Sequence, residues 1–210
     1  MTAPALFICA AFLALLYEAA FCWRETSWPK SLIKTGAVAA LALAAPGFGA
    51  PTLIIAGLAL GALGDFFLSR PGEKAFLAGM GAFAAGHLAY AAEFWVPGTL
   101  PPLYPALVLL VLGASTELWL APRTGALRWP VRAYVVVITL MALAAMTLGP
   151  DRQIALAGAV LFVASDLLLS LDLFVVKSAA LNRLLSHALW AAYWTGQALI
   201  LLGMAANPPF

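Results

Sequence analysis

Long apolar stretches follow one another along the whole chain, and short segments with proline, glycine or basic residues separate them. A helix needs about 20 mainly apolar residues to cross the hydrocarbon core of a bilayer. Prolines such as Pro51, Pro97 and Pro130 fall at or near the proposed helix ends. We therefore predict eight transmembrane helices, over residues 3–22, 32–46, 51–69, 75–95, 101–121, 130–148, 153–176 and 181–204.

The composition agrees with a membrane protein built as one unit. Of the 210 residues, 64% are hydrophobic and only 10% are charged, whereas soluble domains carry about 25% charged residues. No segment is polar enough to form a separate soluble domain. We predict an all-α polytopic membrane protein, with residues 1–210 forming a single transmembrane domain.

The N-terminal segment carries two further indications. No basic residue precedes the first apolar stretch, so we expect this helix to stay in the protein and not to be cleaved as a signal peptide. Cys9 and Cys22 lie thirteen residues apart, or roughly 20 Å along a helix. They are too far apart for a disulfide, and we interpret them as small apolar side chains.

Basic residues predict the orientation of the helices. Ten of the eleven lysines and arginines fall on one side of the proposed bundle, and only Arg152 falls on the other. Because cytoplasmic loops are enriched in these residues, both termini are expected on the non-cytosolic side. The Ala-, Gly- and Leu-rich composition suggests a bacterial source, and hence the bacterial cytoplasmic membrane.

Ionisable residues inside the apolar stretches are the main functional candidates, because a charge within a membrane helix costs a few kcal/mol. Asp65 lies about one turn from the end of its stretch, and Asp166 lies eleven residues before Lys177, or roughly 16 Å. His87 is similarly deep. His187 lies closer to the predicted cytosolic end.

Polar seams indicate which helix faces point into the bundle. One stripe on residues 75–95 consists of Phe83, His87, Tyr90 and Phe94. A second seam on residues 181–204 consists of Asn182, Ser186, Tyr193 and Gln197. Three glycines flank Asp65 and predict close approach of that helix to its neighbours: Gly57, Gly61 and Gly64.

An internal repeat would relate the two aspartates. The segment GDFFLS at residues 64–69 parallels SDLLLS at residues 165–170, 101 residues and four predicted helices later. Four helices restore the same direction across the membrane. A duplicated four-helix unit, with its halves related by an axis along the membrane normal, is therefore a hypothesis for this chain.

Several of these segments together resemble the lysoplasmalogenase family of membrane proteins, also called the YhhN-like family. The resemblance runs from about residue 30 to residue 201. Besides GDFFLS, the segments that carry it are FLAGMGAFAAGHLAY (76–90), the spacing of Tyr134, Ile138 and Met141, LFVASDLLL (161–169) and AAYWTGQALI (191–200).

The resemblance implies an eight-helix hydrolase that cleaves the vinyl-ether bond of lysoplasmalogens to a fatty aldehyde and a glycerophospho-ethanolamine or -choline. The residues that match the family's motif positions are Asp65, Asp166, His87, Tyr90, Tyr193 and Gln197. Two departures are Trp194, where the family often has a second tyrosine, and Thr35, where proline usually follows the lysine.

The proposed chemistry suits these residue types. Vinyl-ether hydrolysis needs an acid to protonate the β-carbon and a negative group to stabilise the resulting cation. Two carboxyl groups in one low-dielectric cavity can supply both, because they do not ionise together easily. We therefore predict that Asp65 and Asp166 meet in a shared, water-filled recess, where His87 and Tyr90 orient a carboxyl group or the water.

A second set of residues is expected to bind the lysophospholipid substrate within the bilayer. Tyr193 and Gln197 can hold the glycerol hydroxyl or the ether oxygen, and Lys34 and Arg70 can meet the phosphate. Asn182 and His187 belong to the same predicted substrate-binding group. Besides this substrate and membrane lipids, we expect no nucleic-acid partner, no cofactor and no metal.

Other interpretations remain open from the sequence. Asp65 can simply pair with Arg70 at the membrane edge, His87 can be a packing residue, and Tyr193 and Gln197 can only bridge helices. A metal site of both histidines plus an aspartate is conceivable. The whole protein can instead be a small proton-coupled transporter, a hydrolase of another lysolipid, or a non-catalytic lipid-binding protein.

Overall fold

The computed structural model describes residues 1–208, and every regular element among them is a helix. Short 3-10 segments extend some helix ends or lie in the connections. The eight α-helices are α1 (Ala3–Ala20), α2 (Trp28–Ala44), α3 (Thr52–Leu68), α4 (Glu73–Phe94), α5 (Leu103–Trp119), α6 (Arg128–Ala145), α7 (Gln153–Phe174) and α8 (Ala179–Met204).

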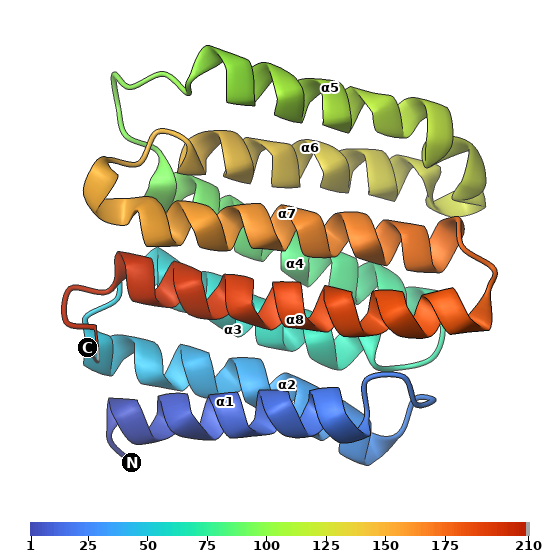
Figure 1. Ribbon diagram of the computed structural model, residues 1–210, viewed down its shortest axis with the longest axis horizontal. Helices are drawn as coiled ribbons and strands as arrows, with labels where there is room; N and C mark the ends of the chain where they lie inside the picture. The colour runs from blue at the N-terminus through green and yellow to red at the C-terminus, as the bar shows by residue number, and fades with distance from the viewer. Residues whose placement is uncertain (209–210) are drawn as a thin grey trace.

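The helices run side by side in one bundle (Figure 1), with α1 and α2 at one edge and α5 at the opposite edge. The two termini lie at the same end of the bundle. The α1–α2, α3–α4, α5–α6 and α7–α8 connections lie at the other end, which we call the basic end because ten of the eleven lysines and arginines belong to it.

Six of the helical segments are long and apolar enough to cross a membrane: α1, α2 with the 3-10 turn that follows it, α4, and α5, α6 and α7 with their adjoining turns. Helix α3 is apolar but has 17 residues, and α8 has 26 residues with a polar seam. The protein is thus an all-helical integral membrane protein. The crossing of α3 and α8 stays a prediction.

Helix boundaries agree with the predicted ones to within three residues, except at the start of α2. This helix begins at Trp28 and not at residue 32. Ser27 caps it by accepting a hydrogen bond from the Lys30 backbone at 3.3 Å, and Pro29 occupies the first turn. Proline is favourable there because N–H groups in the first turn have no acceptor within the helix, so the N–H that proline lacks is not needed.

Close packing of α3 confirms the role expected for its glycines. A Cβ atom at Gly61 would lie 2.5 Å from Nε2 of Gln197, and one at Gly64 would lie 2.6 Å from the Phe83 ring. A Cβ at Gly57 would overlap the Tyr90 ring. The missing side chains of α3 thus make the space that polar and aromatic side chains of α4 and α8 occupy.

Packing is tight between α7 and α8 and loose around α5. A Cβ at Gly158 would lie 2.7 Å from the carbonyl oxygen of Gly196, so these two helices touch backbone to backbone. Helix α5 packs mainly on α6, and Leu109 is its one buried residue. The interior of the protein therefore lies among the other seven helices.

Candidate active site

Asp65 lies in α3, one turn before the helix ends, and its side chain is completely buried. Its Oδ1 atom lies 2.9 Å from Nζ of Lys34 in α2. This contact is an ion pair whose alignment is poor for a hydrogen bond. The Oδ2 atom accepts a hydrogen bond of 2.7 Å from the hydroxyl of Tyr193 in α8.

A chain of buried hydrogen bonds continues from Tyr193. Its hydroxyl accepts a long hydrogen bond of 3.4 Å from Nε2 of Gln197, and Oε1 of Gln197 accepts one of 2.5 Å from the hydroxyl of Tyr90. Each donor in such a chain polarises the next toward the carboxylate. We call these five residues, including Asp65 and Lys34, the Lys34–Asp65 cluster.

Asp166 is the centre of a second network. Its Oδ2 atom accepts a hydrogen bond of 2.8 Å from the hydroxyl of Tyr134 in α6, and it lies 3.4 Å from Nε2 of His87 in α4. The same His87 nitrogen lies 2.9 Å from the Tyr134 hydroxyl oxygen. We call these three residues the His87–Asp166 cluster.

The hydrogen bonds of this second cluster select a histidine tautomer. Because the Tyr134 hydroxyl donates to Asp166, its oxygen is free to accept a hydrogen bond from the N–H at Nε2 of His87. The other ring nitrogen, Nδ1, is buried and has no hydrogen-bond partner among the described residues. A proton on Nε2 therefore satisfies the network, whereas one on Nδ1 would have no acceptor.

The structure does not bring the two aspartates into a shared recess. Asp65 and Asp166 have no hydrogen-bond partner in common. The Phe162 ring packs edge-on against both clusters, with its centre 4.5 Å from the His87 ring and 5.3 Å from the Tyr193 ring. The Phe162 ring therefore contacts one residue of each cluster.

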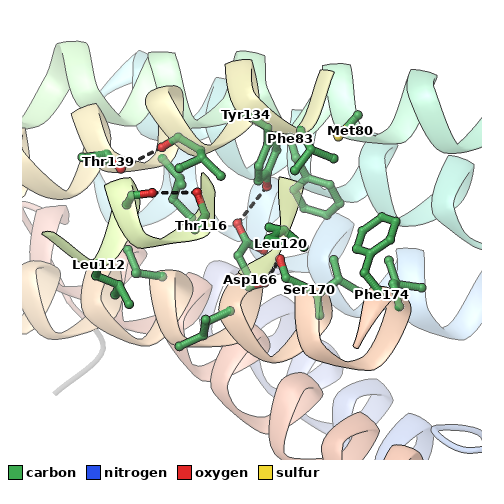
Figure 2. A pocket seen from close by; sticks show the side chains of 18 of the residues that line it. Met80, Phe83, Leu112, Thr116, Leu120, Tyr134, Thr139, Asp166, Ser170 and Phe174 are labelled. Carbon is green, nitrogen blue, oxygen red and sulfur yellow. Dashed lines mark hydrogen bonds between the residues drawn. The ribbon is translucent and has the colours of Figure 1, made fainter. Parts of the chain in front are cut away.

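Asp166 and Tyr134 line an apolar pocket of about 110 Å³. Figure 2 shows the dashed hydrogen bond between these two residues, with Thr116, Leu120, Phe83 and other lining side chains around it. Helices α5, α6 and α7 form most of the wall, and α3 and α4 contribute the rest. The Asp166 side chain is 16% exposed, so a carboxyl group borders an otherwise apolar space.

A larger and more polar cavity of about 270 Å³ opens at the basic end. Lys30, Lys34 and Asp172 line it, together with aromatic residues of α1 and α8. It shares four apolar wall residues with the apolar pocket, so the two spaces are neighbours: Leu68, Phe76, Leu169 and Leu173. Asp65 lines neither space.

Three predicted binding residues lie outside both clusters. The Arg70 guanidinium bonds to Ser31 and stacks on the Trp28 ring at 4.1 Å, so it does not pair with Asp65. Asn182 lies at the start of α8, where its side-chain oxygen is buried and has no hydrogen-bond partner within residues 1–208. His187 pairs with Glu18, with 2.6 Å between Nδ1 and Oε1.

The two histidines therefore belong to different parts of the molecule, and the described residues form no site of both histidines plus an aspartate. His187 and Glu18 instead neighbour Cys22 in the turn after α1. Burial raises the pKa of the Cys22 thiol to about 12, and the nearby Glu18 carboxylate adds to the rise.

Tyr134 is the site residue that sequence reasoning missed. Its hydroxyl joins His87 to Asp166, although nothing in the surrounding sequence marks it as more than an aromatic residue of a membrane helix. The one available signal was its place in the spacing that resembles the lysoplasmalogenase family. Lys34 was predicted to meet a phosphate, whereas the structure pairs it with Asp65.

The fold and these clusters define a polytopic membrane protein with carboxyl groups held inside its helix bundle. The family model of the YhhN family matches residues 30–204, which is most of the chain. The protein belongs to the YhhN family. No solved structure matches it.

Curated relatives cover most of the chain at modest identity. Lysoplasmalogenase TMEM86A of Bos taurus is 34% identical over 184 residues, covering 79% of this chain and 75% of the relative. Lysoplasmalogenase TMEM86B of Rattus norvegicus is 32% identical over 194 residues, covering 88% and 76%. A lysoplasmalogenase of Mycobacterium bovis is 28% identical over 164 residues, covering 71% and 59%.

Proposed function

We propose that this protein hydrolyses the vinyl-ether bond of lysoplasmalogens within the membrane. The names of its curated relatives support this activity. The structural observation that carries the proposal is the position of Asp166. Its carboxyl group, hydrogen-bonded by Tyr134 and 3.4 Å from Nε2 of His87, lies in the wall of an apolar pocket beside a polar cavity.

The two neighbouring spaces suit the two parts of a lysolipid. The apolar pocket suits the part of the hydrocarbon chain next to the ether bond, and the polar cavity suits the phosphate, because Lys30 and Lys34 supply positive charge there. Asp172 can meet an ammonium group in the same cavity. A substrate with its chain in the apolar pocket and its phosphate in the polar cavity has its ether bond between the two spaces, close to Asp166.

The reaction then proceeds as general acid–base catalysis. The protonated Asp166 carboxyl group gives its proton to the β-carbon, and the π electrons of the double bond form the new C–H bond. The resulting carboxylate stabilises the cation shared by the α-carbon and the ether oxygen. Water adds to the α-carbon and returns a proton to Asp166, which restores the acid.

The hemiacetal formed in this way collapses to the products. Its hydroxyl group loses a proton as the bond between the α-carbon and the glycerol oxygen breaks, and the glycerol oxygen gains a proton. The net change is addition of one water molecule, which gives a fatty aldehyde and a glycerophospholipid headgroup. His87 and Tyr134 hold Asp166 through its Oδ2 atom, so Oδ1 is the oxygen that acts on the substrate.

Asp166 and not Asp65 is the acid in this proposal. The Asp166 side chain is 16% exposed in the pocket wall, whereas Asp65 is fully buried and paired with Lys34. The proposal therefore replaces the paired-aspartate mechanism with one reacting carboxyl group. Asp65 acts as a positioning residue that fixes Lys34 at the edge of the polar cavity.

The test uses purified full-length protein in detergent, incubated with lysoplasmenylethanolamine, with aldehyde release followed by a coupled dehydrogenase. We expect turnover by the wild type and a loss of about 100-fold or more in Asp166→Asn, because the amide cannot deliver a proton. Asp151→Asn is the matched control, since Asp151 is 76% exposed at the opposite end of the bundle.

Unchanged aldehyde release by Asp166→Asn would remove Asp166 as the acid. Absence of turnover by the wild type on vinyl-ether, alkyl-ether and acyl lysolipids would contradict the hydrolase itself. Proton-coupled uptake into liposomes by that inactive protein would instead favour the transporter.

The finer topology is part of the same proposal. By the distribution of lysine and arginine, the basic end faces the cytosol and both termini face the opposite side of a bacterial cytoplasmic membrane. A C-terminal alkaline phosphatase fusion should then be active in cells. An inactive fusion beside an active C-terminal fluorescent protein would place the termini in the cytosol.

A further inference from the structure

Three potential metal ligands meet at the basic end, outside the two aspartate clusters, and one of them, Cys22, lines the polar cavity. Glu18 lies in the last turn of α1, Cys22 lies just after that helix, and His187 lies in the third turn of α8. One ligand atom from each of them, the carboxylate oxygen, the thiol sulfur and the imidazole nitrogen, lies within 4.8 Å of the others. These residues are 165 or more positions apart across the two helices, so only the fold brings them together.

Their spacing is close to that of a tetrahedral zinc site. Metal–ligand bonds of about 2.0–2.3 Å place neighbouring ligand atoms about 3.3–3.6 Å apart. The Glu18 and His187 atoms are already 2.6 Å apart, and the Cys22 sulfur lies 3.1 Å from the backbone oxygen of Ser186, the residue before His187. Small side-chain rotations are therefore enough to surround one ion.

The charges of the three ligands and an unpaired oxygen of Glu18 also suit a divalent cation. Binding of Zn²⁺ releases the proton of the Cys22 thiol to solvent, and the resulting thiolate, the carboxylate and the neutral imidazole together carry two negative charges, which balance Zn²⁺. The second carboxylate oxygen of Glu18 is buried and has no hydrogen-bond partner among the described residues. The Lys30 ammonium, which donates to the Cys22 carbonyl at 3.2 Å, opposes a cation, but the two anionic ligands outweigh it.

The surroundings hold the ligands while leaving a path for the ion. The His187 ring lies against Trp23, with 5.2 Å between ring centres, and the Arg183 guanidinium covers Trp23 at 4.5 Å. The side chains of Glu18 and His187 are 32% and 30% exposed, whereas Cys22 is buried. An ion can thus enter from the solvent and meet a sulfur ligand on the inner side.

We propose that Glu18, Cys22 and His187 bind one Zn²⁺ ion, with water as the fourth ligand, and that the ion joins the end of α1 to α8. From the sequence we expected no metal. The proposed site was missed because its ligands come from α1 and α8, which lie at opposite ends of the sequence. Cys22 also lines the polar cavity to which the proposed function assigns the phosphate, whereas Glu18 and His187 line neither cavity. None of the three ligands belongs to the clusters around Asp65 and Asp166.

Cobalt titration tests the site directly, because Co²⁺ occupies tetrahedral zinc sites and its thiolate complexes absorb strongly in the near ultraviolet. The full-length protein, purified in detergent, freed of any histidine tag and treated with EDTA, should bind one Co²⁺ per chain with a thiolate-to-metal absorption band. Added Zn²⁺ should abolish this band. Absence of the band from the wild type would overturn the proposal.

The two cysteines provide a matched pair of variants. Cys9→Ser should keep the band, because Cys9 lies on α1 far from the cluster, whereas Cys22→Ser should lose it. His187→Gln and Glu18→Gln should weaken Co²⁺ binding by about tenfold or more. A band that persists in Cys22→Ser would assign the metal to another site and contradict this one.

A measurement on the wild type alone covers the case in which a variant fails to fold. Bound Zn²⁺ should raise the Tm of the detergent-solubilised protein, by about 5 °C at saturation. It should also protect Cys22, and not Cys9, from alkylation as read by mass spectrometry. Equal alkylation of Cys22 with and without Zn²⁺ would overturn the proposal whatever the variants do.

Discussion

The two aspartate clusters are built from similar parts and differ in their exposure. Each carboxylate has one basic partner and one tyrosine hydroxyl: Lys34 and Tyr193 at Asp65, and His87 and Tyr134 at Asp166. Asp65 has no contact with either cavity, whereas Asp166 borders the apolar pocket. The comparison teaches that a buried carboxylate in a membrane bundle can be structural or chemical, depending on what its free oxygen faces.

The partners also come from corresponding helices. In a four-plus-four repeat, α3 corresponds to α7, α2 to α6 and α4 to α8. Asp65 on α3 has its partners on α2 and α8, and Asp166 on α7 has its partners on α6 and α4. An internal duplication would produce this exchange of partners between halves. The repeat itself stays a hypothesis. In it, Lys34 on α2 and Tyr134 on α6 are the corresponding partners of the two aspartates.

Removing the basic partner should separate the clusters most clearly. Lys34→Met leaves the Asp65 carboxyl group buried without its cation, so we expect a loss of about 3–5 kcal/mol in the free energy of unfolding. His87→Gln should cost less, because Asp166 is partly exposed and keeps Tyr134. Unfolding by SDS titration in mixed micelles measures both variants.

The double variant Lys34→Met with Asp65→Asn is the control for this result. With both charges removed, no ion is left unpaired, and most of the lost stability should return. Equal stability of the single and double variants would show that Asp65 and Lys34 do not depend on each other in the folded protein.

The two tyrosines give the next contrast. Tyr193→Phe removes the 2.7 Å hydrogen bond to a fully buried carboxylate and should cost about 1–3 kcal/mol of stability. Tyr134→Phe should instead lower kcat by about tenfold with a smaller loss of stability, because it loosens a carboxyl group that acts in the pocket. The opposite pattern, with activity lost only in Tyr193→Phe, would move the chemistry to Asp65.

A glycine pair gives the smallest expected effect. Gly61→Ala brings a methyl group to 2.5 Å from the Gln197 amide and should cost stability, at the low end of about 1–3 kcal/mol because that amide can shift. Gly81→Ala in α4 meets no neighbouring atom and should stabilise by about 0.5–1 kcal/mol. Thermal unfolding in detergent compares them. Equal thermal stability of the two variants would contradict close packing at the Lys34–Asp65 cluster.

The sequence was sufficient for the helices and for several of the faces that point inward. The length of each apolar stretch and the prolines and glycines between stretches determine where the helices begin and end, and each helical residue adds about 1.5 Å along the helix axis. The stripe of Phe83, His87, Tyr90 and Phe94 was therefore predicted on an inward face, and all four are buried. The seam on α8 was also right at Tyr193 and Gln197, which are buried.

Partners between distant helices could not be predicted in the same way. Lys34 and Arg70 are both basic residues near Asp65 in depth, and only the rotation of α2 against α3 decides which one pairs with it. Phe162 packs against one ring of each cluster, His87 and Tyr193, and nothing in the sequence indicates this contact. Such choices follow from glycine contacts and ring packing and leave no periodic pattern in a single sequence.

The loose attachment of α5 bears on how lipid and protein exchange molecules. Leu109, Leu112, Gly113 and Thr116 of this helix wall the apolar pocket, yet the helix rests mainly on α6. In a bilayer, spreading α5 from α7 exchanges protein contacts for acyl-chain contacts of similar strength. If the proposed hydrolysis is right, a single-chain lipid can enter sideways between α5 and α7 without its tail crossing water, and the water-soluble product can leave at the basic end.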